Sequence, residues 1–215
     1  MADSYLAVIG DVVQSRATDD RQRLQDRLSQ GLDRVNEQHS GILAARFVLT
    51  LGDEFQGLLS SSEPLIQLLA QLRAAAHPAE LRFGLGIGAL HTELRPEALG
   101  MDGPCFHRAR SAIERARERS TPLEAETPEN RPVLEVYSLL YGELRGRWTT
   151  RQRQVHDLSM SGLDGRTIAE TLDISPSAVS QHLRATGRSA VEAATERWHR
   201  ALTRSLDQSE EEASQ

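Results

Sequence analysis

The stretch Thr50-Leu51-Gly52-Asp53-Glu54-Phe55-Gln56-Gly57-Leu58 places a Gly-Asp-Glu turn between two apolar runs. Phe47-Val48-Leu49 enters the turn, and residues 55–59 leave it. A short turn with glycine between two such runs is typical of a β-hairpin. Because the turn is acidic, the hairpin would bring carboxylates to one point. We therefore expect the functional site to be organised around this turn.

A second predicted strand also ends in a carboxylate. Tyr5-Leu6-Ala7-Val8-Ile9 is a continuous apolar run, typical of a strand buried on both faces, and Asp11 follows it closely. We expect Asp11 and Asp53 to lie side by side and to hold a divalent metal, Mg²⁺, against a nucleotide phosphate. Glu54 would assist at the same point, and three arginines are candidate phosphate clamps, namely Arg16, Arg82 and Arg110.

Length and composition limit the class of protein. The 215 residues suffice for one large domain or two small ones. No run of about 18 apolar residues predicts a membrane span, and the first residues do not resemble a secretory signal. The single cysteine, Cys105, cannot form an internal disulfide and excludes a cysteine-based zinc site. These features predict a cytoplasmic protein without a membrane partner.

The charged residues are distributed unevenly. All 25 basic residues are arginine, so neither a P-loop lysine nor a Schiff-base lysine is present; codon bias in a GC-rich genome is an alternative explanation for this composition. The net charge of −6 comprises −4 over residues 1–148, +2 over 149–206 and −4 over 207–215. A locally basic segment in an acidic protein points weakly to nucleic acid.

The apolar pattern of residues 1–147 predicts an α+β domain with the order strand, helix, strand, strand, helix, strand, helix. This is the ferredoxin-like order, in which the first strand and the hairpin strands are central neighbours. The expected elements are strand 5–9, a helix with Leu24, Leu28, Leu32 and Val35 on its apolar side, strands 44–51 and 55–60, a helix from Ser62, strand 81–90, helix 105–119, an irregular connection 121–132, an edge strand 133–137 and helix 139–147.

The strand at 81–90 has one bare face. Its glycines, Gly84, Gly86 and Gly88, alternate with apolar residues, so another backbone or a ligand can approach this face closely. Close packing of a helix and contact with a ligand both explain this pattern.

Residues 148–206 predict a small all-α domain with a helix-turn-helix. A helix opens after Thr149, a short helix follows Gly165, and a third begins at Pro176. The residues expected to face DNA are Ser177, Ser180, Gln181, Arg184 and Arg188. A helical hairpin used for protein contacts is the alternative. A further helix is expected over 191–206, and residues 207–215 are expected to form an acidic, disordered tail.

Several of these segments resemble known families. Gly52-Asp53-Glu54-Phe55 resembles the hairpin signature of diguanylate cyclases, with Leu51 replacing their first glycine. Three segments resemble parts of class III nucleotidyl cyclases: the metal-binding strand, the arginine-glycine strand and the transition-state helix, here 9–13, 82–88 and 103–114. The chain as a whole resembles the SatD family, through Gly10 to Arg16, Gly52 to Gln56, Gly103 to Arg110 and a C-terminal helix-turn-helix similar to LuxR-type and sigma region 4 units.

The resemblance implies a palm domain that binds a nucleotide and Mg²⁺, with Gly52, Glu54, Arg82 and Arg110 near the nucleotide. If the site is active, Asp53 and Arg110 would be its catalytic residues. Phe106 stands where class III cyclases place an asparagine, and there is no lysine to recognise a purine. We therefore expect a homodimeric DNA-binding regulator controlled by a nucleotide. The alternatives are a Mg²⁺-dependent nucleotidyl cyclase or phosphoryl-transfer enzyme, and a degenerate palm that serves only as a dimerisation scaffold.

Overall fold

A computed structural model describes residues 4–13 and 21–213 of the chain. Within these ranges the protein is α+β, with a five-stranded sheet and eight α-helices. The strands are β1 (Ser4–Val12), β2 (Leu43–Leu51), β3 (Glu54–Leu59), β4 (Leu81–Ala89) and β5 (Leu123–Glu126). The helices are α1 (Arg21–Gln38), α2 (Leu65–Ala76), α3 (Pro104–Arg119), α4 (Arg131–Arg147), α5 (Thr150–Met160), α6 (Gly165–Leu172), α7 (Pro176–Ala185) and α8 (Arg188–Ala213), with a 3₁₀ turn at Ser40–Ile42.

The sheet has the order β2-β3-β1-β4-β5. β1 pairs antiparallel with both β3 and β4, while β5 runs parallel to β4 after the crossover through α3. The predicted order of elements up to α3 is confirmed, and so is the hairpin, in which Gly52 takes a positive φ of 61°. One detail of the prediction is wrong, because β2 lies at the edge of the sheet and only β3 is central beside β1.

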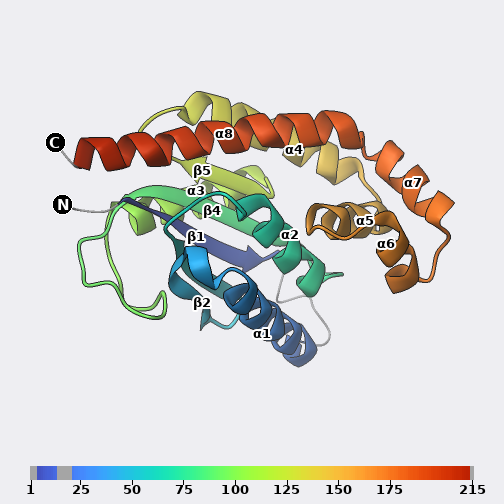
Figure 1. Cartoon of the computed structure of the whole chain (residues 1–215), viewed down its shortest axis with the longest axis horizontal. Coiled ribbons are helices and arrows are strands. Elements are labelled where there is room, and N and C mark those ends of the chain that lie inside the picture. Colours follow the sequence, from blue (N-terminus) through green and yellow to red (C-terminus); the bar gives the residue numbers. More distant parts are fainter. Residues whose placement is uncertain (1–3, 14–20, 214–215) are drawn as a thin grey trace.

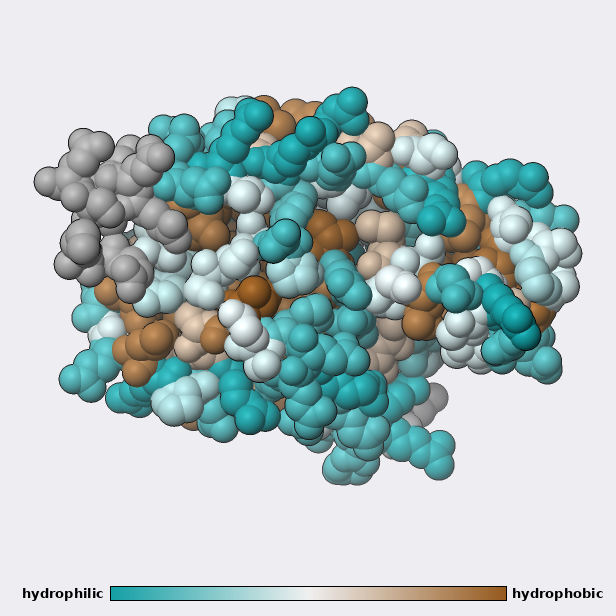
Figure 2. Space-filling view, viewed as in Figure 1, coloured by the Kyte–Doolittle hydropathy of each residue, from teal (hydrophilic) through white to brown (hydrophobic). Residues whose placement is uncertain are grey.

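Two apolar layers enclose the sheet. On one face, side chains of β1, β3 and β4 pack against α1, α2 and the middle of α8, where Trp198, Leu202 and Leu206 are buried. On the other face, Ala7, Ile9 and neighbouring residues pack against α3. β1 is therefore buried on both faces, as its unbroken apolar run predicts. Figure 1 shows α8 passing along the length of the molecule above the sheet, while teal polar residues cover much of the face in Figure 2.

The glycine face of β4 is filled by the backbone of α3. A Cβ on Gly86 would lie 2.2 Å from both Ala109 N and Cys105 O, and one on Gly84 would lie 2.3 Å from Ile113 N. Of the two explanations left open by the sequence, close helix packing is the one observed at these two positions.

Three predictions for the second half of the chain are wrong. Residues 133–137 form the first turns of α4, because Pro132 occupies a favourable first-turn position and the buried Leu134, Ser138 and Tyr141 repeat with a helical period. Residues 121–132, expected to be irregular, contain β5. Residues 207–213, expected to be disordered, continue α8 to Ala213 beyond its buried Leu206.

Helices α5, α6 and α7 surround a small core of their own, formed by Val155, Ile168, Ala169, Val179 and Leu183. Each helix has a side-chain cap: the oxygens of Thr149, Asp164 and Ser175 accept hydrogen bonds from backbone N–H groups of the first turn. Residues 173–175 join α6 to α7, and Asp173 takes the left-handed conformation there. The helices predicted after Thr149, Gly165 and Pro176 are thus confirmed as helices.

Candidate functional site

A row of three charged side chains crosses the sheet at the end of β1. Asp11 lies opposite Glu54 of β3 on one side and opposite Arg82 of β4 on the other. Directly opposed residues of antiparallel strands carry their side chains on the same face, and this is the face covered by α3. The hairpin and the end of β1 therefore bring charges to one point, as the sequence predicts.

Helix α3 supplies two further arginines to this row. Arg110 makes a two-pronged contact with Glu54, at 2.8 Å from Nη1 to Oε2 and 2.7 Å from Nη2 to Oε1. Arg117, two turns further along, joins both carboxylates: Nε donates to Asp11 Oδ2 at 2.7 Å and Nη2 donates to Glu54 Oε2 at 3.0 Å. Arg82 Nε donates to the other Asp11 oxygen at 3.1 Å. We call these five residues the arginine–carboxylate cluster.

The cluster carries three positive and two negative charges, and its exposed part is cationic. The side chains of Asp11 and Glu54 are only 8% and 11% exposed, whereas those of Arg110 and Arg117 are each 40% exposed. The hydrogen bonds from Arg110 are the main cause that lowers the pKa of Glu54, so this carboxyl stays ionised at neutral pH. The buried carboxylates thus fix the arginines, and the arginines face outward.

The carboxylates do not fit a metal ion in this arrangement. Both oxygens of Asp11 and both of Glu54 accept hydrogen bonds from guanidinium groups. Across residues 4–13 and 21–213, no three His, Cys, Asp or Glu side chains are grouped so as to hold a metal ion. Asp11 was predicted to lie beside Asp53, but the residue opposite it is Glu54. Asp53 lies at the tip of the hairpin, where its backbone carbonyl accepts a hydrogen bond from Val12 N at 3.2 Å.

The other predicted nucleotide-binding residues are placed as follows. Glu54, Arg82 and Arg110 belong to the cluster, and Gly52 forms the hairpin turn, where its carbonyl accepts from Gln25 Nε2 of α1 at 2.8 Å. Arg16 lies outside the described residues. Arg117 was not predicted from the sequence, although its spacing of seven residues from Arg110 puts both on one side of a helix and could have revealed it.

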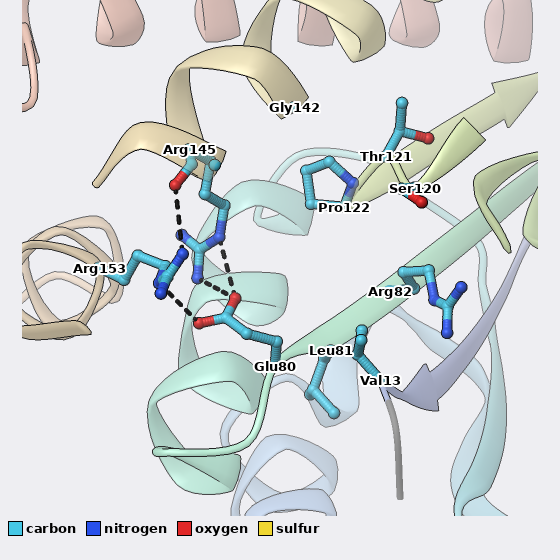
Figure 3. A pocket seen from close by; sticks show the side chains of 11 residues that line it. Val13, Glu80, Leu81, Arg82, Ser120, Thr121, Pro122, Gly142, Arg145 and Arg153 are labelled. Carbon is cyan, nitrogen blue, oxygen red and sulfur yellow. Dashed lines mark hydrogen bonds and ion pairs between the residues drawn. The ribbon is translucent and has the colours of Figure 1, made fainter. Parts of the chain in front are cut away.

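A cavity of about 190 Å³ adjoins the cluster through Arg82, which lines both. Its walls combine apolar side chains, Val13, Leu81 and Pro122, with the hydroxyl-bearing residues Ser120 and Thr121. Figure 3 shows Arg145 and Arg153 directed toward Glu80 on the side of the cavity opposite Arg82. A cavity of this size is smaller than the roughly 300–1,000 Å³ of typical ligand pockets, so it would accommodate only part of a ligand held at the cluster.

One wall of the cavity is a buried ion-pair network that the sequence analysis did not predict. Arg145 donates two hydrogen bonds to Asp157, at 2.8 and 2.7 Å, and also contacts Glu80 Oε2 at 2.9 Å. Burial alone would raise the pKa of Asp157, yet the adjacent Arg145 guanidinium holds that pKa below its usual range. Arg145 therefore ties α4 to α5 and to the segment that enters β4.

The fold and the cluster define an α+β protein with a candidate anion-binding site at the end of its central strand. The family model of the SatD family matches residues 5–191, most of the chain, and the protein belongs to that family. No curated protein matches the chain. No helix in the described part of the chain is long and apolar enough to span a membrane.

Several solved structures are similar to the chain at low identity. The catalytic core of a rhodopsin-guanylyl cyclase with converted specificity, in complex with ATPalphaS, is 16% identical over 53% of this chain and 72% of that chain, with a TM-score of 0.39. The guanylyl cyclase domain of the RhoGC fusion protein from the aquatic fungus Blastocladiella emersonii is 16% identical over 53% of this chain and 75% of that chain, with a TM-score of 0.41. A bacterial light-regulated adenylyl cyclase is 12% identical over 69% of this chain and 82% of that chain, with a TM-score of 0.45.

Proposed function

We propose that the protein binds a nucleoside triphosphate by its phosphates at the arginine–carboxylate cluster. The observation that carries this proposal is the cationic exposed side of the cluster, where Arg110 and Arg117 are half-exposed and the three arginines of the cluster outnumber its two carboxylates. Guanidinium groups bind phosphate oxygens in pairs, and arginines already fixed by buried partners lose little freedom on binding. The cavity beside Arg82 would take part of the nucleoside.

Phosphoryl transfer is the second candidate activity of this site. The position of Asp11 and Glu54 favours this activity, because Arg117 contacts both carboxylates and would also contact the phosphates. Donors gathered around phosphates stabilise the charge that develops during transfer, and a carboxylate released from its arginine can accept a proton. Binding without turnover would make the same site a sensor.

One incubation separates these two activities. The protein is mixed with each of the four nucleoside triphosphates, with and without Mg²⁺, and three quantities are measured: bound nucleotide, the nucleoside diphosphate left by phosphoryl transfer, and the pyrophosphate left by cyclisation. Binding without either product supports a sensor, whereas formation of either product that is lost in Asp11→Asn and Asp53→Asn supports turnover. Absence of binding for all four nucleotides would contradict the proposal and would leave the scaffold interpretation.

We further propose that α7 binds DNA as the second helix of a helix-turn-helix. The supporting observation is its exposed polar side: Ser177, Ser180, Gln181 and Arg184 are exposed, whereas Val179 and Leu183 are buried in the small core. Exposed Arg188 follows at the start of α8, where it pairs with Glu192 at 2.7 Å. In a nucleotide-controlled regulator, occupancy of the cluster would alter DNA affinity through the Arg145 contacts that join α4 and α5.

Gel retardation on genomic fragments tests this second proposal. Gln181→Ala with Arg184→Ala should weaken specific retardation, and raised salt should weaken it further because phosphate contacts are lost. Arg95→Ala, an exposed arginine far along the chain from α7, is the matched control and should retain binding. Equal retardation by the wild type and the α7 variant would contradict the assignment.

A further inference from the structure

The guanidinium group of Arg117 joins the two buried carboxylates of the arginine–carboxylate cluster. Its Nε donates to Asp11 Oδ2 at 2.7 Å, and its Nη2 donates to Glu54 Oε2 at 3.0 Å. A Mg²⁺ ion in a phosphate site is held by one or two carboxylates together with the phosphates of the ligand. Arg117 therefore lies, with a positive charge of its own, between the two oxygens that would otherwise be open to such an ion.

The other oxygens of these carboxylates are also occupied. Arg82 Nε donates to Asp11 Oδ1 at 3.1 Å, and Arg110 donates to both oxygens of Glu54. Mg²⁺ needs its ligand oxygens at about 2.0–2.1 Å in nearly octahedral geometry, so it could reach Asp11 and Glu54 only if Arg117 moved away. It would then lie beside two further guanidinium groups, whose charges repel it.

The packing of α3 fixes Arg117 in this position. The backbone N of Ile113, one turn earlier in α3, lies 2.3 Å from the place that a Cβ on Gly84 would take, and Ala116 is completely buried. The backbone of the helix is thus in direct contact with β4. The arginine keeps donors for a ligand, because 40% of its side chain is exposed and its Nη1 makes no hydrogen bond to the described residues.

We propose that Arg117 takes the place of a divalent cation in this site, so that guanidinium groups alone hold the phosphates and no metal ion joins them to Asp11 and Glu54. The inference rests on the proposed binding of a nucleoside triphosphate, and it specifies the form that is bound, which is the metal-free anion. Charge favours this form: the cluster has a net charge of +1, from three arginines and two carboxylates, and Mg²⁺ cancels two of the ligand's negative charges. Arg117 is then a residue that determines specificity, because it selects the free triphosphate over its Mg²⁺ complex.

Binding of Mn²⁺ in the absence of nucleotide tests the exclusion of a metal ion by itself. Electron paramagnetic resonance should show the same Mn²⁺ affinity for the full wild-type chain and for Asp11→Asn, because Asp11 is held by arginines. Arg117→Ala opens the space between the carboxylates and should bind one Mn²⁺ at least about tenfold more tightly than the wild type. The gain should disappear when Asp11→Asn is added to Arg117→Ala.

Arg108→Ala is the matched control for this measurement. It removes an arginine from the same helix, but Arg108 Nη1 donates to the backbone carbonyl of Ile87, so no carboxylate is freed. Its Mn²⁺ affinity should match that of the wild type. Circular dichroism establishes that each variant is folded.

Isothermal titration of the triphosphate that binds best, in EDTA and in excess Mg²⁺, tests which form of the ligand is bound. The wild type should bind at least as tightly in EDTA as in Mg²⁺. Arg117→Ala should bind more weakly in EDTA and should recover when Mg²⁺ is added, because the ion then enters the space that the guanidinium has left.

Three results overturn this inference and leave triphosphate binding intact. They are wild-type binding that is more than about tenfold tighter with Mg²⁺ than in EDTA, a wild-type Mn²⁺ site that is lost in Asp11→Asn, and a folded Arg117→Ala that gains no Mn²⁺ affinity. Absence of triphosphate binding under both conditions contradicts the proposed function instead, and the Mn²⁺ measurements then decide by themselves whether Arg117 excludes a metal ion.

Discussion

At the scale of single residues, Arg117 lies between two buried carboxylates and contacts both. Its Nε faces Asp11 and its Nη2 faces Glu54, while 40% of its side chain remains exposed. Glu54 in turn holds Arg110 through both oxygens. The geometry of the exposed arginines therefore depends on the buried acids, which makes Glu54 a residue whose charge should matter for stability and for binding.

Glu54→Gln should lower the free energy of unfolding at pH 7 by about 1–2 kcal/mol, because a charged hydrogen-bond partner is lost from arginines that are partly screened by water. The folded pKa of Glu54 is lowered, so its contribution is complete above its unfolded value near 4.5 and is lost as pH falls through the folded value. Urea denaturation at several pH values should show the wild type and variant converging in acid. Glu170→Gln, in an exposed pair with Arg166, should cost less than about 0.5 kcal/mol; an equal loss in both variants would contradict this account.

At the scale of elements, the packing of α3 on β4 depends on glycine. Gly86→Ala would place a Cβ 2.2 Å from backbone atoms of α3, which cannot move aside as a flexible side chain can. We expect a loss of more than about 2 kcal/mol and weaker nucleotide binding, because α3 carries Arg110 and Arg117. Gly146→Ala is the control, since nothing lies within 4 Å of its added Cβ, and in helix α4 it should stabilise by about 0.5–1 kcal/mol. Thermal unfolding that ranks the two variants in the reverse order would refute this packing.

Helix α5 contains a buried histidine that gives stability a second pH dependence. His156 lies against Trp148, with ring centroids 4.6 Å apart and the ring planes tilted by 53°, and burial lowers the pKa of His156 to about 4. Between pH 6.5 and 4 the unfolded chain binds a proton that the folded chain does not, so this group makes stability fall as pH falls, by at most about 1.4 kcal/mol per pH unit. His156→Phe keeps an aromatic ring there and should flatten the stability profile between pH 6 and 5. Identical slopes for the two proteins in denaturant titrations would show that His156 is protonated in the fold.

At the scale of the whole molecule, the sequence predicted what depends on neighbouring residues and missed what depends on distant ones. The hairpin at Gly52 and the cap at Thr149 act within a few residues, and each is found where it was expected. β5 is short and is fixed by its pairing with β4 after a long crossover, which no local pattern reveals. The same holds for α8, whose Trp198 returns to the core beside the sheet.

In the candidate site, too, the individual residues could be predicted from the sequence, whereas the contacts between distant residues could not. Asp11, Glu54, Arg82 and Arg110 were singled out because each lies at the end of an element or in a motif, and the sheet register brings them together. Their pairing was not predictable: the alternation of side chains along β3 places Glu54 across from Asp11 on the α3 face, and the arginines of α3 neutralise both acids. The predicted metal site was inferred from the acidic residues alone and did not take account of the arginines that α3 supplies from a distant part of the sequence.

The proposal that the arginine–carboxylate cluster binds phosphates is tested most directly by isothermal titration calorimetry. The dissociation constant of the triphosphate with the highest affinity is measured for the wild type, Arg117→Met and Arg166→Met. Arg117→Met should weaken binding at least about tenfold, as expected when a charged hydrogen bond to phosphate is lost. Arg166→Met, a highly exposed arginine paired only locally with Glu170, should bind within about twofold of the wild type. If Arg117→Met binds the triphosphate as tightly as the wild type does, phosphates are not held by the arginine–carboxylate cluster.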